Sequence, residues 1–121
     1  MLMNAKKELK EHVANINKTV LAAEIKIGNS YYNSEDEVIR ATLYPDHIKL
    51  EDPMRALAIE EFLSAIDVEY YNGYGVQELY GTIWYTDGTY SDRHEYDGSE
   101  CWAYHRPPAL PEQPKIKIKN D

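Results

Sequence analysis

The sequence predicts an α+β fold: a twisted antiparallel sheet of about five strands, packed against one main helix and a shorter N-terminal helix. Two Asp-Gly pairs, Asp87-Gly88 and Asp97-Gly98, lie between aromatic-rich segments, a pattern typical of tight hairpin turns. They predict a three-stranded meander at the C-terminal end of the sheet. A helical apolar stripe over about residues 53–66 supplies the element that packs on it.

Both expected helices have recognisable local signals. Over residues 4–15, apolar side chains recur every three or four positions opposite a lysine-rich face. For the helix over 53–66, Asp52 is a natural N-cap, and Pro53 suits the first helical position because no N–H is needed there. Arg55 should face outward together with Glu60 and Glu61. The predicted buried stripe consists of Met54, Leu57, Ala58, Phe62, Ala65 and Ile66, widened by Ile59 and Leu63.

Strands are expected where apolar and polar residues alternate. This period of two covers residues 20–27 and 37–44, and a short extended segment follows the main helix over 68–71. The first strand of the meander covers 79–85. Successive side chains of a strand point to opposite sides. One face of this strand should therefore carry Leu79, Gly81, Ile83 and Tyr85, and the other Tyr80, Thr82 and Trp84.

We expect residues 1–106 to form a single α+β domain, since 121 residues leave no room for two. Four prolines make residues 107–121 an extended, proline-rich tail. Lysine and isoleucine alternate near its end, which fits either an added strand or a basic arm that pairs with a neighbour.

Composition excludes some classes of partner. The net charge of −8 argues against binding to DNA or RNA, which requires a basic face. It is compatible with imitation of nucleic acid or simply with solubility. No apolar run approaches the ~20 residues of a membrane span, and the N-terminus is no secretory signal. One cysteine allows no intrachain disulfide, so we expect a cytoplasmic protein without membrane contact.

No motif for catalysis, cofactor or metal binding is recognised, so no enzyme is expected. Phosphate-binding loops, dinucleotide fingerprints and Cys-x-x-Cys pairs are missing from the sequence. His94 and His105 would meet across neighbouring strands with Asp92 or Glu95, but their spacing gives a metal site no specific support. Cys101 is expected to be a buried packing residue rather than a nucleophile.

The aromatic meander allows two interpretations: a wall of the core, or a platform for a flat ligand. Arginine forks bind phosphate oxygens, and tyrosine or tryptophan faces stack on bases. We therefore hypothesise a pocket for a small nucleotide. Its candidate ligand-binding residues are Tyr80, Trp84, Tyr90, Arg93, Tyr104, His105 and Arg106.

Three segments carry a resemblance to a group of small phage-encoded proteins. Residues 73–84, 87–90 and 95–102 read GYGVQELYGTIW, DGTY and EYDGSECW, and a proline-rich exit follows. This resembles the group's shared pattern, from which Cys101 departs, since Trp or a similar residue is common there. The chain is also similar to the Thoeris anti-defence 1 proteins, phage sponges that capture cyclic ADP-ribose signals without cleaving them.

The second resemblance implies a homo-oligomer, a dimer or larger, with ligand held at subunit junctions by aromatic and arginine side chains. The function expected is therefore sequestration of a cyclic nucleotide immune signal in the host cytoplasm. Two alternatives stay open. One is an acidic protein–protein inhibitor of a host defence complex, of the anti-CRISPR or anti-restriction type, acting through residues such as Glu35, Asp36 and Glu37. The other is a small accessory protein whose aromatic sheet is only its core.

Overall fold

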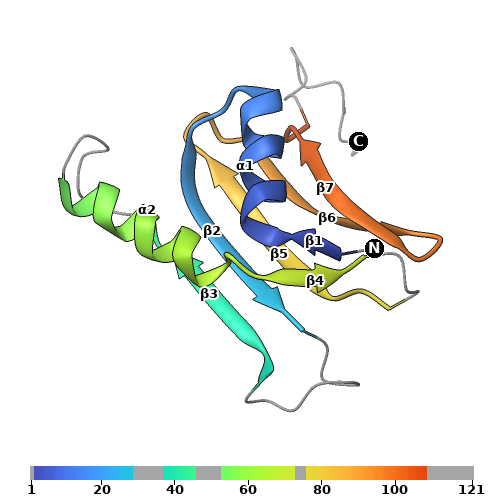
Figure 1. The fold of residues 1–121 in the computed structure, drawn as a ribbon. Coiled ribbons are helices and arrows are strands. Elements are labelled where there is room, and N and C mark those ends of the chain that lie inside the picture. Colours follow the sequence, from blue (N-terminus) through green and yellow to red (C-terminus); the bar gives the residue numbers. More distant parts are fainter. Residues whose placement is uncertain (1, 29–36, 46–52, 73–75, 109–121) are drawn as a thin grey trace, which may run out of the picture.

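The computed structural model describes residues 2–28, 37–45, 53–72 and 76–108. It has the predicted α+β architecture, with two helices, a five-stranded sheet and a separate two-stranded sheet among those residues (Figure 1). The elements in chain order are β1 (Leu2–Asn4), α1 (Ala5–Ile16), β2 (Val20–Ile27), β3 (Ile39–Leu43), α2 (Pro53–Ala65), β4 (Glu69–Tyr71), β5 (Leu79–Tyr85), β6 (Tyr90–Tyr96) and β7 (Ser99–His105).

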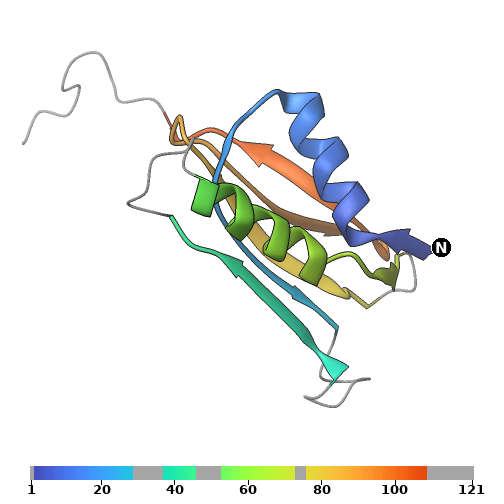
Figure 2. The same ribbon diagram turned by 60° about the vertical axis from the view of Figure 1, so that its left-hand side comes forward.

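The main sheet has the strand order β3-β2-β5-β6-β7, and every neighbouring pair is antiparallel. The predicted meander is therefore confirmed as β5-β6-β7. The short strand β1 was not predicted; it pairs with β4 to form the small sheet. Figures 1 and 2 show both helices and this small sheet on one face of the main sheet. No described helix covers the opposite face, which we call the open face.

Local signals place the element ends close to their predicted positions. Asn4 caps α1, because its side chain accepts the Lys7 N–H at 2.9 Å, and Asn17 ends the helix with a left-handed φ of 55°. The β6–β7 turn has positive φ at both Asp97 and Gly98, as a two-residue hairpin turn requires. The tail prediction for residues 109–121 lies outside the described residues.

The core fills the space between the helices and the covered face of the sheet. Alternate residues of β2, β3 and β5 point into it, as the period of two predicts. The large buried aliphatic and aromatic side chains come from both helices, the segment after α2 and the strands β2, β3, β5 and β7. They are Leu9, Ile25, Ile27, Leu43, Phe62, Ile66, Tyr70, Leu79, Ile83, Tyr85 and Trp102.

Helix α2 packs differently from the prediction. Arg55, expected to face outward, is only 1% exposed, whereas Met54 and Leu57 of the predicted buried stripe are 60% and 47% exposed. Arg55 donates from Nη1 to the carbonyl of Tyr44 at 2.9 Å and from Nη2 to that of Leu21 at 2.5 Å. The Leu21 carbonyl lies where the β2–β5 register shifts. Arg55 is thus buried because it satisfies backbone acceptors near irregular strand ends.

Replacing Arg55 with methionine should lower the free energy of unfolding by about 2 kcal/mol, because methionine keeps the packing but leaves two carbonyls without their charged donor. Urea denaturation followed by circular dichroism measures this loss. Glu60→Gln, at an exposed position of the same helix, is the control and should change stability by less than about 0.5 kcal/mol. Equal stability of the two variants would contradict the role assigned to Arg55.

His12 couples stability to pH. Its Nε2 lies 2.8 Å from Ser91 Oγ, and its ring stacks on Trp102 with centroids 6.3 Å apart. Burial, and then the nearby charge of Arg93, lower the pKa of His12 below 6.5. The unfolded chain therefore binds this proton at a higher pH than the folded chain does.

We expect the stability contributed by neutral His12 to be complete above pH 6.5 and to be lost as the pH falls from there toward the lower folded pKa. The urea concentration at which half of the protein is unfolded, measured between about pH 5 and 8, tests this pH dependence. His12→Gln, which does not titrate, should give a flatter profile across the same range. A wild-type profile as flat as that of the variant would refute the prediction.

Candidate functional site

The open face carries three rows of side chains, two of which run across β3, β2 and β5 and the third across β2 and β5. The rows follow from the strand register, which pairs Lys26 with Arg40 and Tyr80, and Glu24 with Thr42 and Thr82. We name them by their chemistry. The cationic row is Arg40–Lys26–Tyr80, the central row is Thr42–Glu24–Thr82, and the aromatic row is Ala22–Trp84.

Two adjoining hollows follow these rows. The first, of about 550 Å³, is lined by the cationic and central rows together with Ile25, Gly81 and Trp84. The second, of about 430 Å³, continues past the aromatic row toward Tyr44 and Pro45. The two hollows share Glu24, Thr42 and Trp84. Together they form a shallow trough along β2, of a size typical for small-molecule sites.

The cationic row concentrates positive charge at one end of this trough. Lys26 Nζ lies 4.6 Å from the centroid of the Tyr80 ring, a cation–π contact that holds the ammonium group over the open face. Arg40 is its cross-strand partner on the other side. An ammonium and a guanidinium group on adjacent strands suit an anionic group such as a phosphate.

Trp84 decides between the two interpretations of the aromatic meander. Its side chain is 41% exposed on the open face, and Tyr80 and Tyr90 are only partly buried. Tyr85 and Trp102, on the other face, are buried in the core. The meander is therefore a core wall on its covered face and an accessible aromatic surface on its open face.

The open face continues beyond Trp84 onto β6 and β7. Tyr90 is the cross-strand partner of Trp84, and its ring stacks on His105 with centroids 5.1 Å apart. His105 Nε2 lies 2.7 Å from Asp92 Oδ1. Four of the seven predicted ligand residues, Tyr80, Trp84, Tyr90 and His105, thus lie on one face.

Arg93 points to the covered face, because residues of β6 alternate and its neighbours Asp92 and His94 take the open side. Its side chain is 1% exposed. Arg93 Nη1 lies 3.2 Å from Glu8 Oε2, and Nη2 donates to Glu100 Oε1 and to the Tyr70 hydroxyl, each at 2.9 Å. Two carboxylates already engage this guanidinium, so it is not offered to a ligand on the open face.

Glu8, Tyr70, Arg93 and Glu100 form what we call the Arg93 cluster. Burial alone lowers the pKa of Arg93, but the charges of Glu8 and of the other acidic partners outweigh it, so that pKa is raised. Burial, and then the hydrogen bond to Glu8, raise the pKa of the Tyr70 hydroxyl. Arg93 therefore stays charged and Tyr70 neutral, as a stable ion-pair cluster requires.

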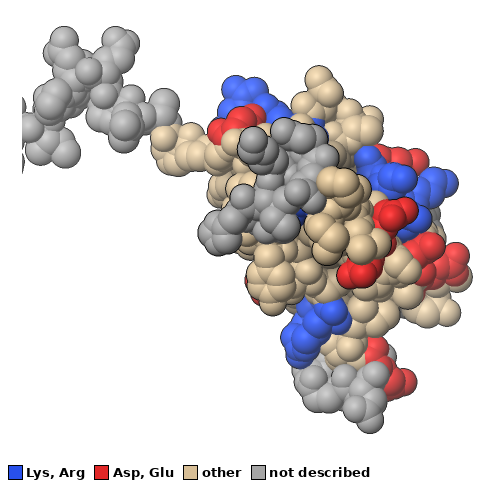
Figure 3. All heavy atoms as spheres, turned by 90° about the vertical axis from the view of Figure 1, so that its left-hand side faces the viewer, with Lys and Arg blue, Asp and Glu red and all other residues tan. Residues whose placement is uncertain are grey.

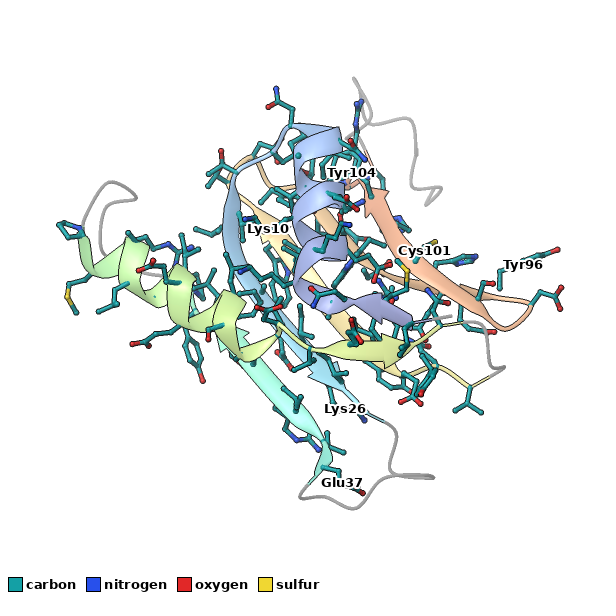
Figure 4. The ribbon with its side chains drawn as sticks, viewed as in Figure 1. Lys10, Lys26, Glu37, Tyr96, Cys101 and Tyr104 are labelled. Atoms are coloured by element: carbon teal, nitrogen blue, oxygen red, sulfur yellow. The ribbon has the colours of Figure 1, made fainter. Side chains whose placement is uncertain are left out.

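Tyr104 and Arg106 also lie away from the rows. The Tyr104 ring packs on the covered side, 6.0 Å from the Tyr85 ring and 5.6 Å from Lys18 Nζ. Figure 4 places Tyr104 near the C-terminal end of α1, whereas Lys26 lies at the other end of the sheet. Arg106 is exposed just after β7 ends.

The ligand-binding residues predicted from the sequence do not include Glu24, Lys26 or Arg40. The alternation over residues 20–27 does place Glu24 and Lys26 on the same strand face. Their register opposite Tyr80 and Thr82 joins strands separated by more than fifty residues, counted from Lys26 to Tyr80. No local signal in the sequence reports such pairing.

The described residues contain no group of three or more His, Cys, Asp or Glu side chains arranged to hold a metal ion. His105 is paired with Asp92, whereas His94 stacks on Tyr96. Cys101, predicted to be buried, is exposed, because it lies on the open face of the edge strand β7 opposite His94. Among the described helices, none combines the length and apolar character needed to cross a bilayer.

A third cavity, of about 280 Å³, lies between α1 and α2 above β2 and β5. Its walls are mostly aliphatic core residues, and its charged side chains are Lys10 and Lys18. Lys18 is already paired with Asp87 at 2.6 Å. This cavity has few polar groups to orient a nucleotide, so the trough on the open face is the stronger candidate site.

Comparison with protein-family models, with curated proteins and with solved structures gave no match for this chain.

Proposed function

We propose that this protein binds a small nucleotide on its open face and sequesters it without cleaving it. The observation that carries the proposal is the exposed Trp84 ring beside a hollow of about 550 Å³ that also contains Lys26 and Arg40. An accessible ring stacks on a base, and neighbouring cations neutralise a phosphate.

The biological role in this proposal comes from the resemblance of the meander to phage proteins. The ligand would be a cyclic nucleotide immune signal of the cyclic ADP-ribose type, and the protein would act in the cytoplasm of the infected host. Capture works by mass action, because binding lowers the free signal below the concentration that its receptor needs. No bond of the ligand needs to break.

Self-association is part of the same proposal. The trough is shallow, and a tightly held ligand usually has most of its surface buried. A second copy of the chain over the open face would cover the ligand and explain a homo-oligomeric sponge. Native mass spectrometry with and without cyclic ADP-ribose would report the number of subunits and of retained ligands together.

Trp84→Ala is expected to weaken binding of cyclic ADP-ribose by about fivefold to 150-fold, since loss of one base-stacking ring costs about 1–3 kcal/mol. Isothermal titration calorimetry measures the affinity, and recovery of intact ligand after heating shows that it was not cleaved. Tyr96→Ala removes a 74% exposed ring at the tip of the β6–β7 hairpin and serves as the matched control. The proposal fails if the wild-type protein binds no cyclic nucleotide.

Inhibition of a host defence complex through acidic surface is the alternative proposal. It draws on the net charge of −8, although Glu35 and Asp36 lie outside the described residues. Figure 3 shows both signs of charge interspersed with uncharged surface on the side that it presents. Binding of this kind should weaken steeply with salt. This alternative would be favoured if the wild type captured a nuclease or effector from host lysate and a variant with the charge of Glu37 reversed did not.

A further inference from the structure

We propose that the open face selects ribonucleotides over deoxyribonucleotides and holds them in one direction. In this arrangement the phosphates lie over the cationic row, the ribose hydroxyls over the central row and the base on Trp84. The inference rests on the proposed nucleotide binding and adds the ligand class, the orientation and a specificity-determining residue, Glu24.

The spacing of the rows supports this order. Neighbouring rows are two residues apart along β2, which corresponds to about 6.6–6.8 Å for an antiparallel strand. The cationic and aromatic rows are therefore separated by about 13 Å. A nucleoside diphosphate carries its base, ribose and phosphates in line over a comparable length. The chemistry of the three rows follows the same order as these three parts.

In this arrangement Glu24 recognises the ribose by accepting hydrogen bonds from its hydroxyl groups. A carboxylate only accepts hydrogen bonds and has two oxygens, so it matches a vicinal pair of hydroxyl donors. Acidic side chains bind ribose hydroxyls in this way in dinucleotide-binding folds. Within the described residues, the Glu24 carboxylate has no hydrogen-bond or ion-pair partner, and the hydroxyls of Thr42 and Thr82 flank it on both sides.

Glu24 also sets the direction of the ligand. Its negative charge repels phosphates from the middle of the trough, and Lys26 and Arg40 attract them to one end only. The second hollow beyond Trp84 is lined by Ala22, Tyr44 and Pro45 and contains no lysine or arginine. A reversed nucleotide would place its phosphates there, where no cation in the lining compensates their charge.

The test compares ribose and deoxyribose ligands by isothermal titration calorimetry. The ligand pairs are ADP with 2′-deoxy-ADP, and cyclic ADP-ribose with its 2′-deoxy analogue. For the wild type, removing the hydroxyl should weaken binding by about tenfold to a hundredfold, the effect of a lost hydrogen bond to a charged acceptor. Glu24→Ala, which removes the acceptor, should lose most of this discrimination, and Glu11→Ala, at an exposed position of α1, should keep it.

Lys26→Met tests the direction. It should weaken the binding of ADP by about tenfold. The affinity for adenosine, which has no phosphate, should stay nearly unchanged. Equal binding of the ribose and deoxyribose ligands by the wild type would overturn this inference while leaving the proposed function intact. Discrimination that persists in Glu24→Ala would also overturn it. If the wild type binds none of the four nucleotides, the proposed function itself fails.

Discussion

Replacing Arg93 with methionine is expected to lower the free energy of unfolding by about 3–5 kcal/mol, the usual cost of removing one partner from a buried ion pair. Arg93 is the only cation in its cluster, and it faces both Glu8 and Glu100. Without it, the Glu8 and Glu100 carboxylates lose the cation that pairs with both of them. For a domain with a net stability of about 5–15 kcal/mol, this is a large fraction of the total.

The cluster joins elements that are distant in the sequence. Glu8 comes from α1, Tyr70 from β4, Arg93 from β6 and Glu100 from β7. The Glu100 carboxylate also accepts the backbone N–H groups at the start of β5, from Glu78 at 2.8 Å and from Leu79 at 3.1 Å. Loss of Arg93 should therefore loosen the contact of α1 and β4 with the meander.

Urea denaturation followed by circular dichroism measures the effect of Arg93→Met. Arg106→Met is the matched control, because Arg106 is exposed and its loss should cost less than about 0.5 kcal/mol. Adding Glu100→Gln to Arg93→Met should restore part of the stability, since it removes one of the two unpaired charges. A loss below about 1 kcal/mol in the single variant would contradict the role of the cluster.

Gly81→Val is expected to lower the free energy of unfolding by about 3 kcal/mol, at the upper end of the cost of overpacking a close contact. A Cβ atom at this position would lie 2.5 Å from the backbone oxygen of Glu24 and 3.1 Å from Ile25 Cγ1. The obstacle is backbone, which cannot rotate away, so β2 and β5 would have to separate. Glycine is required here by the close approach of two strands.

The same substitution should weaken nucleotide binding, because β2 and β5 carry the residues that form the three rows. Thr82→Val is the matched control for stability alone, because Thr82 belongs to the central row: it exchanges one β-branched residue for another on the neighbouring open-face position and should cost less than about 1 kcal/mol. Thermal unfolding of both variants tests the loss of stability, and calorimetric titration of Gly81→Val against the wild type tests the loss of binding. Equal stability of Gly81→Val and Thr82→Val would refute it.

The secondary structure was largely predictable because its signals are local. Alternation of apolar and polar residues predicted β2 with its observed bounds, and the two Asp-Gly pairs predicted the turns of the meander. Asn4 and Asn17 close α1 through contacts within a few residues. Strand β1 escaped prediction, because three residues are too few to show a period and their partner, β4, lies more than sixty residues away.

The site was predictable only in part. Sequence composition pointed to the aromatic meander, and four of its candidate residues share the open face. From the sequence alone, Arg93 and Tyr104 were equally suitable as ligand-binding residues. The alternation of side chains along β6 and β7 turns both toward the helices. Arg55 shows the same difficulty in α2: it interrupts an apparently outward helix face, and only the backbone carbonyls of Tyr44 and Leu21 explain its burial.

The amino-acid sequence by itself determined the fold class, the period of each long strand, the hairpin turns and the aromatic character of the meander, because each depends on neighbours along the chain. Tertiary structure alone decided which face is open, where the charged side chains of β2 and β3 meet Tyr80 and Trp84, and which arginines are buried. Those outcomes depend on strand register and on helix placement. A shift of one residue in the register of a strand would turn all of its side chains to the other face.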